Sequence, residues 1–183
     1  MPRAGLDSDR VVSAAAAIAD ADGLPALTLS GLAQRLGVRS PSLYGHVAGL
    51  EDLRRRLGRR GAAELGDRLA EAAAGRAGHD ALGAIAAAYR TYAKEHPGTY
   101  AALQRADAAD RDGARRVVGV VLAVLRGYGL QGDAAIHGAR SVRAALHGFV
   151  TLEMGAGFGI PLDLDESFHR LIAVLDRGLR PAD

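Results

Sequence analysis

The 183-residue chain contains no cysteine, which excludes disulfide bonds and cysteine-based catalysis and favours a cytosolic protein. Its longest nearly uninterrupted apolar run, residues 117–125, is far shorter than the roughly 18–20 residues that a membrane-spanning helix needs. No N-terminal stretch combines a charged start with a long apolar run, so the sequence predicts no signal peptide. We therefore expect a soluble, cytoplasmic protein, and the length is ample for a hydrophobic core.

The sequence also has little that indicates an enzyme. None of its histidines forms an i, i+4 pair or an HExxH motif, the spacings that favour a metal site; they are His46, His79, His96, His137, His147 and His169. The glycine-rich stretch 155–159 lacks the spacing of a dinucleotide-binding loop and predicts the end of a helix. No serine-centred elbow and no paired carboxylate motif is present. We expect no catalytic site, no metal and no cofactor.

The distribution of charge is more informative than its net value of +2. Residues 1–60 contain nine arginines and six acidic residues, whereas the remainder contains fourteen basic and fifteen acidic residues. A basic N-terminal part indicates contact with nucleic acid. A general preference of the genome for Arg, Ala and Gly explains the same composition, so both interpretations stay open.

Apolar residues recur at helical spacing along most of the chain, which predicts an all-α fold of about nine helices. The valine-rich segment 117–125 also suits a buried strand, but no second strand-like run exists to pair with it. Asp7 or Ser8, Asp80, Asp107 or Asp110, Asp133 and Asp163 are the expected helix caps. Outside the helix-turn-helix, the expected helices span about 6–21, 50–74, 80–95, 97–104, 133–154 and 163–179. One more helix is expected to start after Asp107 or Asp110, to contain residues 117–125 and to end at Gly127.

Residues 27–53 have the pattern of a helix-turn-helix. Leu32, Ala33 and Leu36 form one apolar stripe, and Leu43 and Val47 form a second. Between them, Gly37 suits the left-handed position that ends a helix. Ser40 is expected to cap the second helix, with Pro41 at its first position. Two short helices joined by a tight turn favour DNA binding.

The second helix of such a unit enters the major groove by its N-terminal end. Arg39, Ser40, Ser42 and Gly45 are expected to face bases and phosphates there, and an arginine can bond guanine with two hydrogen bonds. The hydroxyls of Ser42 and Tyr44 can bind phosphate oxygens, as can His46. Alternatively, Tyr44 and His46 pack on the surface against the following helix.

These residues resemble the TetR family of transcription regulators. The segment LTLSGLAQRLGVRSPSLYGHVAGLEDL is similar to the N-terminal signature of that family, especially to the tetracycline repressors. The resemblance covers about residues 6–55. It implies DNA contacts at eight positions, namely Thr28, Ser30, Arg39, Ser40, Ser42, Tyr44, Gly45 and His46.

Two positions depart from the family pattern. Leu50 stands where the family usually has a lysine that contacts a phosphate, so we expect weaker anchoring there. Gly45 replaces a larger side chain, so fewer base contacts are expected at that position. A degenerate helix-turn-helix on a small helical enzyme or ligand-binding protein is the alternative that the missing lysine favours.

The C-terminal half resembles the subgroup with a WHG-type sensing domain, through the segments 96–100 (HPGTY) and 143–153 (RAALHGFVTLE). This resemblance implies a DNA-binding domain over 1–50, a connecting helix over 50–75 and a ligand-sensing and dimerisation domain over 76–183. Residues that could line an apolar pocket with a few polar groups, or could equally be ordinary core, are Tyr89, Tyr92, Tyr100, Leu103, Gln104, Val121, Leu125, His147, Phe149 and Phe158.

The resemblance also implies dimerisation through the last two helices. Two copies of residues 133–154 and 163–179 are expected to form a four-helix bundle through Ile136, Val142, Phe149, Phe168, Leu171, Ile172 and Leu175. The sequence thus predicts a ligand-responsive regulator that binds a near-palindromic operator in double-stranded DNA as a homodimer. A repressor is the favoured form and an activator is the alternative, which the sequence does not separate from it. A small-molecule effector is expected to release it from that operator.

Overall fold

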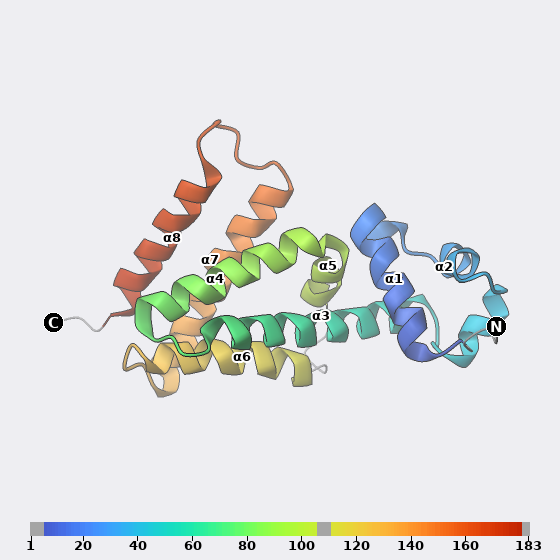
Figure 1. Cartoon of the computed structure of the whole chain (residues 1–183), viewed down its shortest axis with the longest axis horizontal. Helices are drawn as coiled ribbons and strands as arrows, with labels where there is room; N and C mark the ends of the chain where they lie inside the picture. The colour runs from blue at the N-terminus through green and yellow to red at the C-terminus, as the bar shows by residue number, and fades with distance from the viewer. Residues whose placement is uncertain (1–5, 106–110, 181–183) are drawn as a thin grey trace. The chain divides into compact units, whose positions relative to one another are not determined.

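The computed structural model describes the backbone of residues 6–105 and 111–180, and within these ranges all regular secondary structure is helical (Figure 1). This confirms the all-α prediction, including the helical form of the valine-rich segment. No helix in the described ranges is long and apolar enough to cross a membrane. The α-helices and the short 3-10 helices η1 and η2 are α1 (Ser8–Asp22), η1 (Leu24–Ala26), α2 (Leu29–Leu36), η2 (Ser40–Gly45), α3 (Leu50–Ala73), α4 (Gly78–Glu95), α5 (Pro97–Arg105), α6 (Arg111–Arg126), α7 (Gly132–Met154) and α8 (Leu164–Leu179).

The helices form two compact units, and neither unit is one continuous stretch of chain. Unit 1 contains residues 1–63 and 95–113, and unit 2 contains residues 64–94 and 114–183. The boundary at 63/64 falls inside α3, so this helix contributes its first half to one unit and its second half to the other. The assignment of DNA binding to residues 1–50 and of sensing to residues 76–183 stays a prediction.

Unit 1 has its own hydrophobic core. Asp7 caps α1 as predicted, because its carboxylate accepts a hydrogen bond of 2.7 Å from the Arg10 amide. Fully buried side chains from α1, α2, η2 and α3 meet in one cluster, whose larger members include Val11, Leu27, Leu32, Leu43, Leu53 and Leu57. The apolar stripes of the predicted helix-turn-helix therefore hold this unit together.

In unit 2, α7 and α8 lie side by side as an antiparallel hairpin (Figure 1). Asp163 caps α8 as predicted, because it accepts hydrogen bonds from the amides of Asp165 and Glu166. At the far end of α8, the buried Asp176 accepts a hydrogen bond of 2.7 Å from the Tyr128 hydroxyl. Burial and this carboxylate raise the pKa of Tyr128.

Two predicted caps are wrong, Asp80 by three residues and Asp133 by two. Helix α4 begins at Gly78 and α7 at Gly132, so Asp80 and Asp133 lie in the first helical turn instead of before it. Acidic side chains are favourable in either place, because both face the positive end of the helix dipole. Asp107 and Asp110 lie outside the described residues.

Candidate nucleic-acid interface

The helix-turn-helix begins with α2, which Thr28 caps. Its hydroxyl oxygen accepts a hydrogen bond of 3.1 Å from the Gly31 amide and lies 3.3 Å from the Ser30 hydroxyl. Both Thr28 and Ser30 are exposed at the start of the helix. Thr28, predicted as a DNA contact, therefore also has a structural role in α2.

The turn after α2 follows the prediction at Gly37 and departs from it at Ser40. Gly37 has a left-handed backbone (φ 69°), and its amide donates to the carbonyls of Ala33 and Gln34. The predicted cap at Ser40 is wrong, because Arg39 occupies the cap position and Ser40 is already helical. Consistent with this shift, Pro41 is the second helical residue, and the structure shows no side-chain cap.

Segment η2, which corresponds to the predicted second helix of the helix-turn-helix and is called the recognition segment below for its predicted role, is a 3-10 helix with one buried and one exposed side. Leu43 is 0% exposed and Val47 just after it is 2% exposed, so both anchor the segment in the core. Tyr44, in contrast, is 61% exposed, which argues against the alternative that it packs on the surface. Of the other predicted contacts, Arg39, Ser42 and Gly45 are exposed, while Ser40 and His46 are half-buried.

The exit from the recognition segment is fixed by Asp52. Its carboxylate accepts a hydrogen bond of 3.0 Å from the Ala48 amide and also pairs with Arg55 and Arg56. The Ala48 amide contributes most to lowering the pKa of Asp52. The carboxylate therefore stays ionised at neutral pH and fixes the connection between η2 and the start of α3 through Ala48.

Leu50 lacks a charge for a structural reason. Its side chain is half-buried and packs against the core of unit 1, where an ammonium group would lose hydration. Its apolar side chain offers no charge to a phosphate, so weaker anchoring at this position stays a prediction.

A group of arginines on α3 was not predicted as part of the interface. We call it the α3 arginine cluster, and it consists of Arg54, Arg55, Arg56, Arg59 and Arg60. Arg54 pairs with Glu51, and the Arg60 guanidinium donates to the Ser13 hydroxyl at 2.6 Å. A cavity of about 350 Å³ lies beside this cluster, lined by Ser8, Asp9, Val12, Arg56, Arg59 and Arg60. The run RRRLGRR was the signal for it in the sequence, and its positive charge suits a phosphate backbone.

The ten predicted ligand residues are divided between the two units. Tyr100, Leu103 and Gln104 lie on α5 in unit 1. The others belong to unit 2, in which Tyr89, Tyr92 and Leu125 are buried and Val121 is half-buried. The Tyr92 hydroxyl donates to Glu64 at 3.0 Å.

Phe149 lies at the centre of an aromatic cluster in unit 2. Its ring centroid is 5.0 Å from that of Phe158 and 5.0 Å from that of Phe168. Two predicted ligand residues, Phe149 and Phe158, are thus in contact. Nearby in the sequence, burial lowers the pKa of the half-buried His147, with a smaller effect of Arg143, so this imidazole is neutral at pH 7.

Four of the seven predicted interface residues are buried within a single copy of the chain, namely Val142, Phe149, Phe168 and Ile172. Ile136 on α7 is 39% exposed, and Leu171 and Leu175 on α8 are half-buried. Between the latter two, Val174 is 55% exposed. The apolar surface that one copy leaves open on α8 is therefore a stripe of Leu171, Val174 and Leu175 at helical spacing.

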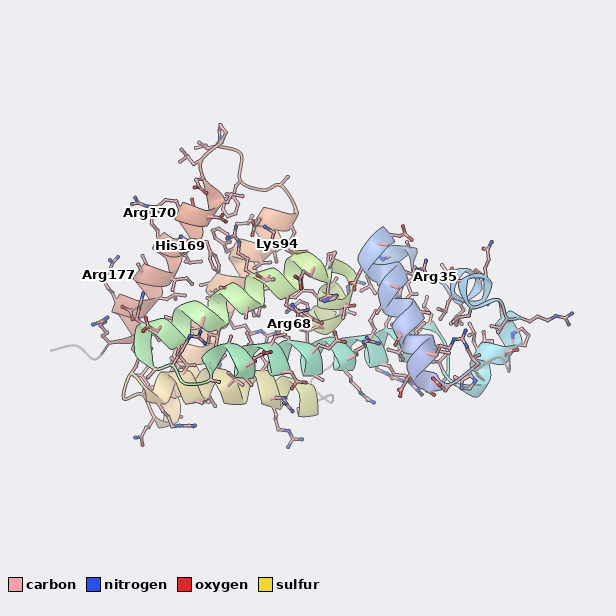
Figure 2. The ribbon with its side chains drawn as sticks, in the orientation of Figure 1. Arg35, Arg68, Lys94, His169, Arg170 and Arg177 are labelled. Carbon is pink, nitrogen blue, oxygen red and sulfur yellow. The ribbon has the colours of Figure 1, made fainter. Side chains whose placement is uncertain are left out.

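The polar residues of α8 surround this stripe. Figure 2 shows His169, Arg170 and Arg177 extending from the outer side of the helix, and all three are exposed. Across residues 6–105 and 111–180, no group of three His, Cys, Asp or Glu side chains is arranged to hold a metal ion.

Comparison with known proteins agrees with this arrangement. Residues 82–175 match the family model "Tetracyclin repressor-like, C-terminal domain". An HTH-type transcriptional regulator of Mycobacterium tuberculosis is 39% identical over 96% of this chain and 83% of its own length. The HTH-type transcriptional regulator YobS of Bacillus subtilis is 36% identical over 97% of this chain and 95% of its own length.

Solved structures share the fold. A TetR variant from Acinetobacter baumannii, determined in complex with minocycline, superimposes with a TM-score of 0.74. The match covers 97% of this chain and 100% of that chain at 22% sequence identity. Taken with the matched family model and the two relatives, this shows that the chain belongs to the TetR family of HTH-type transcriptional regulators.

Proposed function

We propose that the chain is a transcriptional repressor that binds a near-palindromic operator as a homodimer and is released by a small-molecule effector. The single observation that carries DNA recognition is Tyr44, which is 61% exposed on a segment whose other side is locked into the core. An aromatic side chain held out into solvent beside Arg39 and Ser42 is suited to the phosphates and base edges of a major groove.

We propose a homodimer because a single recognition segment of six residues is too short to specify an operator by itself. We assign the interface to the Leu171–Val174–Leu175 stripe together with Ile136. In such a dimer, two recognition segments about 34–36 Å apart reach successive major grooves of a palindromic site. The other predicted interface residues, Val142, Phe149, Phe168 and Ile172, are buried within one copy and stabilise the hairpin of α7 and α8.

For the effector we propose a site in unit 2 near Phe149, Phe158 and His147. Aromatic walls with a few polar groups are the usual lining of a small-molecule site, and a neutral imidazole offers one donor and one acceptor. The effector acts by binding more tightly to a conformation in which the two recognition segments of the dimer no longer fit the major grooves of the operator. We propose no catalytic activity for the chain and place its action in the cytoplasm, where the DNA lies.

Replacing Arg39 and Tyr44 together with alanine is expected to weaken operator binding by about a hundredfold, since each lost contact is worth about 1–3 kcal/mol. The operator is first obtained by selection of random duplexes with the wild-type protein, and the affinities are then measured by fluorescence anisotropy. Arg126→Ala is the matched control, because it removes one positive charge from an exposed site in unit 2.

Equal affinity of the double variant and the wild type for the selected duplex would exclude η2 as the recognition segment. The wild-type affinity is also expected to fall steeply with salt, because contacts with phosphates release counterions. An affinity independent of salt would contradict a DNA interface built on Arg39 and the α3 arginine cluster.

A further inference from the structure

The cavity beside the α3 arginine cluster is lined by residues of two helices of unit 1. Helix α1 and helix α3 contribute three side chains each, namely Ser8, Asp9 and Val12, and Arg56, Arg59 and Arg60. All six lie within residues 1–63. The cavity therefore belongs to the unit that contains the helix-turn-helix, whereas the effector site proposed above belongs to unit 2.

The lining of this cavity is electropositive. It contains three guanidinium groups and one carboxylate, which gives a net charge of +2. The planar guanidinium group stays protonated and matches the oxygens of a phosphate with two parallel hydrogen bonds. A phosphate monoester carries between about 1.5 and 2 negative charges at pH 7. The charge of the cavity thus complements a phosphate monoester.

Two of the three arginines are held in place by other side chains. Nε of Arg56 donates a hydrogen bond of 2.9 Å to Asp52, and the Arg60 guanidinium donates one of 2.6 Å to the Ser13 hydroxyl. Each of these bonds uses one of the five N–H groups of a guanidinium. A side chain that is already oriented loses less conformational entropy when a ligand binds. The cavity is therefore prepared for an anion before the anion arrives.

The remaining lining residues indicate what accompanies the phosphate. The Asp9 carboxylate only accepts hydrogen bonds when it is ionised, so it suits a hydroxyl group of the ligand. Val12 is 9% exposed and adds an apolar surface for a carbon skeleton. The volume of about 350 Å³ lies near the lower end of the roughly 300–1,000 Å³ of small-molecule sites. These features fit a small molecule that is larger than a phosphate ion.

We propose that this cavity binds a small phosphate monoester with hydroxyl groups, of which a sugar phosphate is the simplest kind. Arg56, Arg59 and Arg60 bind the phosphate, and Asp9 accepts a hydrogen bond from a hydroxyl. The DNA backbone is the other source of phosphate for these arginines, but its diesters carry one charge each and offer Asp9 no hydroxyl. The inference goes beyond the proposed function, because it adds a second ligand site in the other unit.

Isothermal titration calorimetry of the full-length protein at constant ionic strength tests this site. The probes are ribose 5-phosphate, inorganic phosphate and ribose. The wild type is expected to bind one ribose 5-phosphate per chain, about tenfold more tightly than inorganic phosphate, because only the ester bonds both the arginines and Asp9. Ribose alone is expected to show no measurable binding, since it lacks the charged group.

Two variants separate the two halves of the site. Arg59→Gln is expected to bind ribose 5-phosphate about tenfold more weakly, the size of one lost charge-assisted hydrogen bond. Its control is Arg126→Gln, which removes an exposed arginine of unit 2. Asp9→Ala is expected to weaken ribose 5-phosphate about tenfold but to bind inorganic phosphate no more weakly than the wild type. Its control is Asp80→Ala, which removes an exposed carboxylate from the first turn of α4.

A scrambled DNA duplex distinguishes the two sources of phosphate. Asp9→Ala is expected to bind this duplex no more weakly than the wild type, because the backbone has no use for the carboxylate. Equal losses for the duplex and for ribose 5-phosphate would assign the cavity to DNA and overturn the inference. It is also overturned if the wild type binds ribose 5-phosphate no more tightly than inorganic phosphate, or if both variants bind the ester as the wild type does.

Discussion

Replacing Gly98 with alanine is expected to lower the free energy of unfolding of the protein by about 2–3 kcal/mol, the usual range for an overpacked interior. Alanine at this position would place a Cβ atom 1.9 Å from the Ala19 carbonyl oxygen and 2.1 Å from its carbonyl carbon. Both atoms are backbone of a core helix, so neither can move aside without shifting α1. Urea unfolding followed by circular dichroism measures the effect.

Gly83→Ala is the matched control for this prediction. Gly83 lies inside α4, and a Cβ atom added there has nothing within 4 Å. Alanine favours a helix interior over glycine by about 1 kcal/mol, so this variant is expected to be more stable than the wild type. The same substitution thus has opposite signs at the two positions. A Gly98→Ala variant that gains stability would contradict the close packing of α1 and α5.

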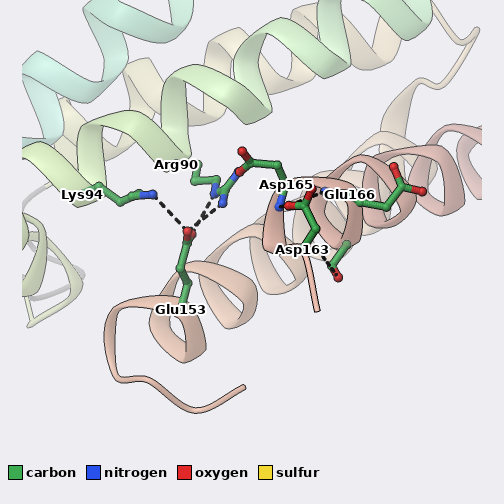
Figure 3. A network of polar contacts seen from close by, with 7 residues as sticks. Arg90, Lys94, Glu153, Asp163, Asp165 and Glu166 are labelled. Carbon is green, nitrogen blue, oxygen red and sulfur yellow. Dashed lines mark hydrogen bonds and ion pairs between the residues drawn. The ribbon is translucent and has the colours of Figure 1, made fainter. Parts of the chain in front are cut away.

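A second large loss of unfolding free energy is expected when Arg90 is replaced, because its side chain links three helices of unit 2 (Figure 3). Its guanidinium makes two hydrogen bonds of 2.7 Å to Glu153 on α7 and an ion pair of 2.7 Å with Asp165 in the first turn of α8. It also lies 4.8 Å from the ring centroid of Phe168. The side chains of Arg90 and Glu153 are only 13% and 9% exposed, so neither is well hydrated without the other.

Arg90→Met is therefore expected to cost about 3 kcal/mol of unfolding free energy, because it leaves the Glu153 carboxylate buried without its main partner. Lys94→Met is the control. Lys94 bonds the same carboxylate at 3.1 Å but is 51% exposed, so its loss is expected to cost less than about 1 kcal/mol. Equal losses in the two variants would show that the Arg90 contacts with Glu153 and Asp165 do not hold the hairpin.

The pH dependence gives this pair an independent test. Hydrogen bonds from Arg90 lower the pKa of Glu153 below its ordinary value of 4.5. A carboxylate with a lowered pKa stabilises the folded state above its unfolded pKa, and this contribution disappears as the pH falls through the folded pKa. The difference in unfolding free energy between the wild type and Arg90→Met is therefore expected to shrink when the pH is lowered from neutral to below 4.5.

The helices could be predicted because their signals are local. Gly37 ends α2 and Pro97 begins α5 at the residues that the pattern indicated, and Asp7 and Asp163 are caps. The failure at Ser40 has the same origin, because a serine before a proline suits both a cap and a first helical residue. No local rule decided between them.

The contacts between helices could not be predicted from the sequence, and the reason is physical. Asp20 on α1 and Thr99 on α5, which are hydrogen-bonded, are 79 residues apart, and Arg90 and Glu153 are 63 residues apart, so neither pair leaves a periodic trace in the sequence. Apolar periodicity marks the side of a helix that is buried, but not whether the same chain or a partner buries it. For this reason Phe168 and Ile172 were predicted at a dimer interface and lie inside a single copy.

The exposure of the candidate DNA contacts could be predicted for Tyr44 and Arg39, because a family signature of 27 residues indicates where side chains face outward. Tyr44 and Arg39 are exposed as expected. The α3 arginine cluster was missed because a run of arginines on a long helix is compatible with any solvated face. Its proximity to α1 became visible only through contacts such as that of Arg60 with Ser13.

We expect two copies of this chain to bind one operator together. Counting the protomers bound to a duplex selected by the wild type, by mass photometry or by light scattering, tests it most directly. We predict two protomers per duplex for the wild type and for Val118→Asp, whose exposed valine lies on α6, but loss of the two-protomer complex for Val174→Asp on α8. One protomer per duplex would contradict binding as a homodimer, and no duplex recovered from the selection would contradict sequence-specific DNA binding.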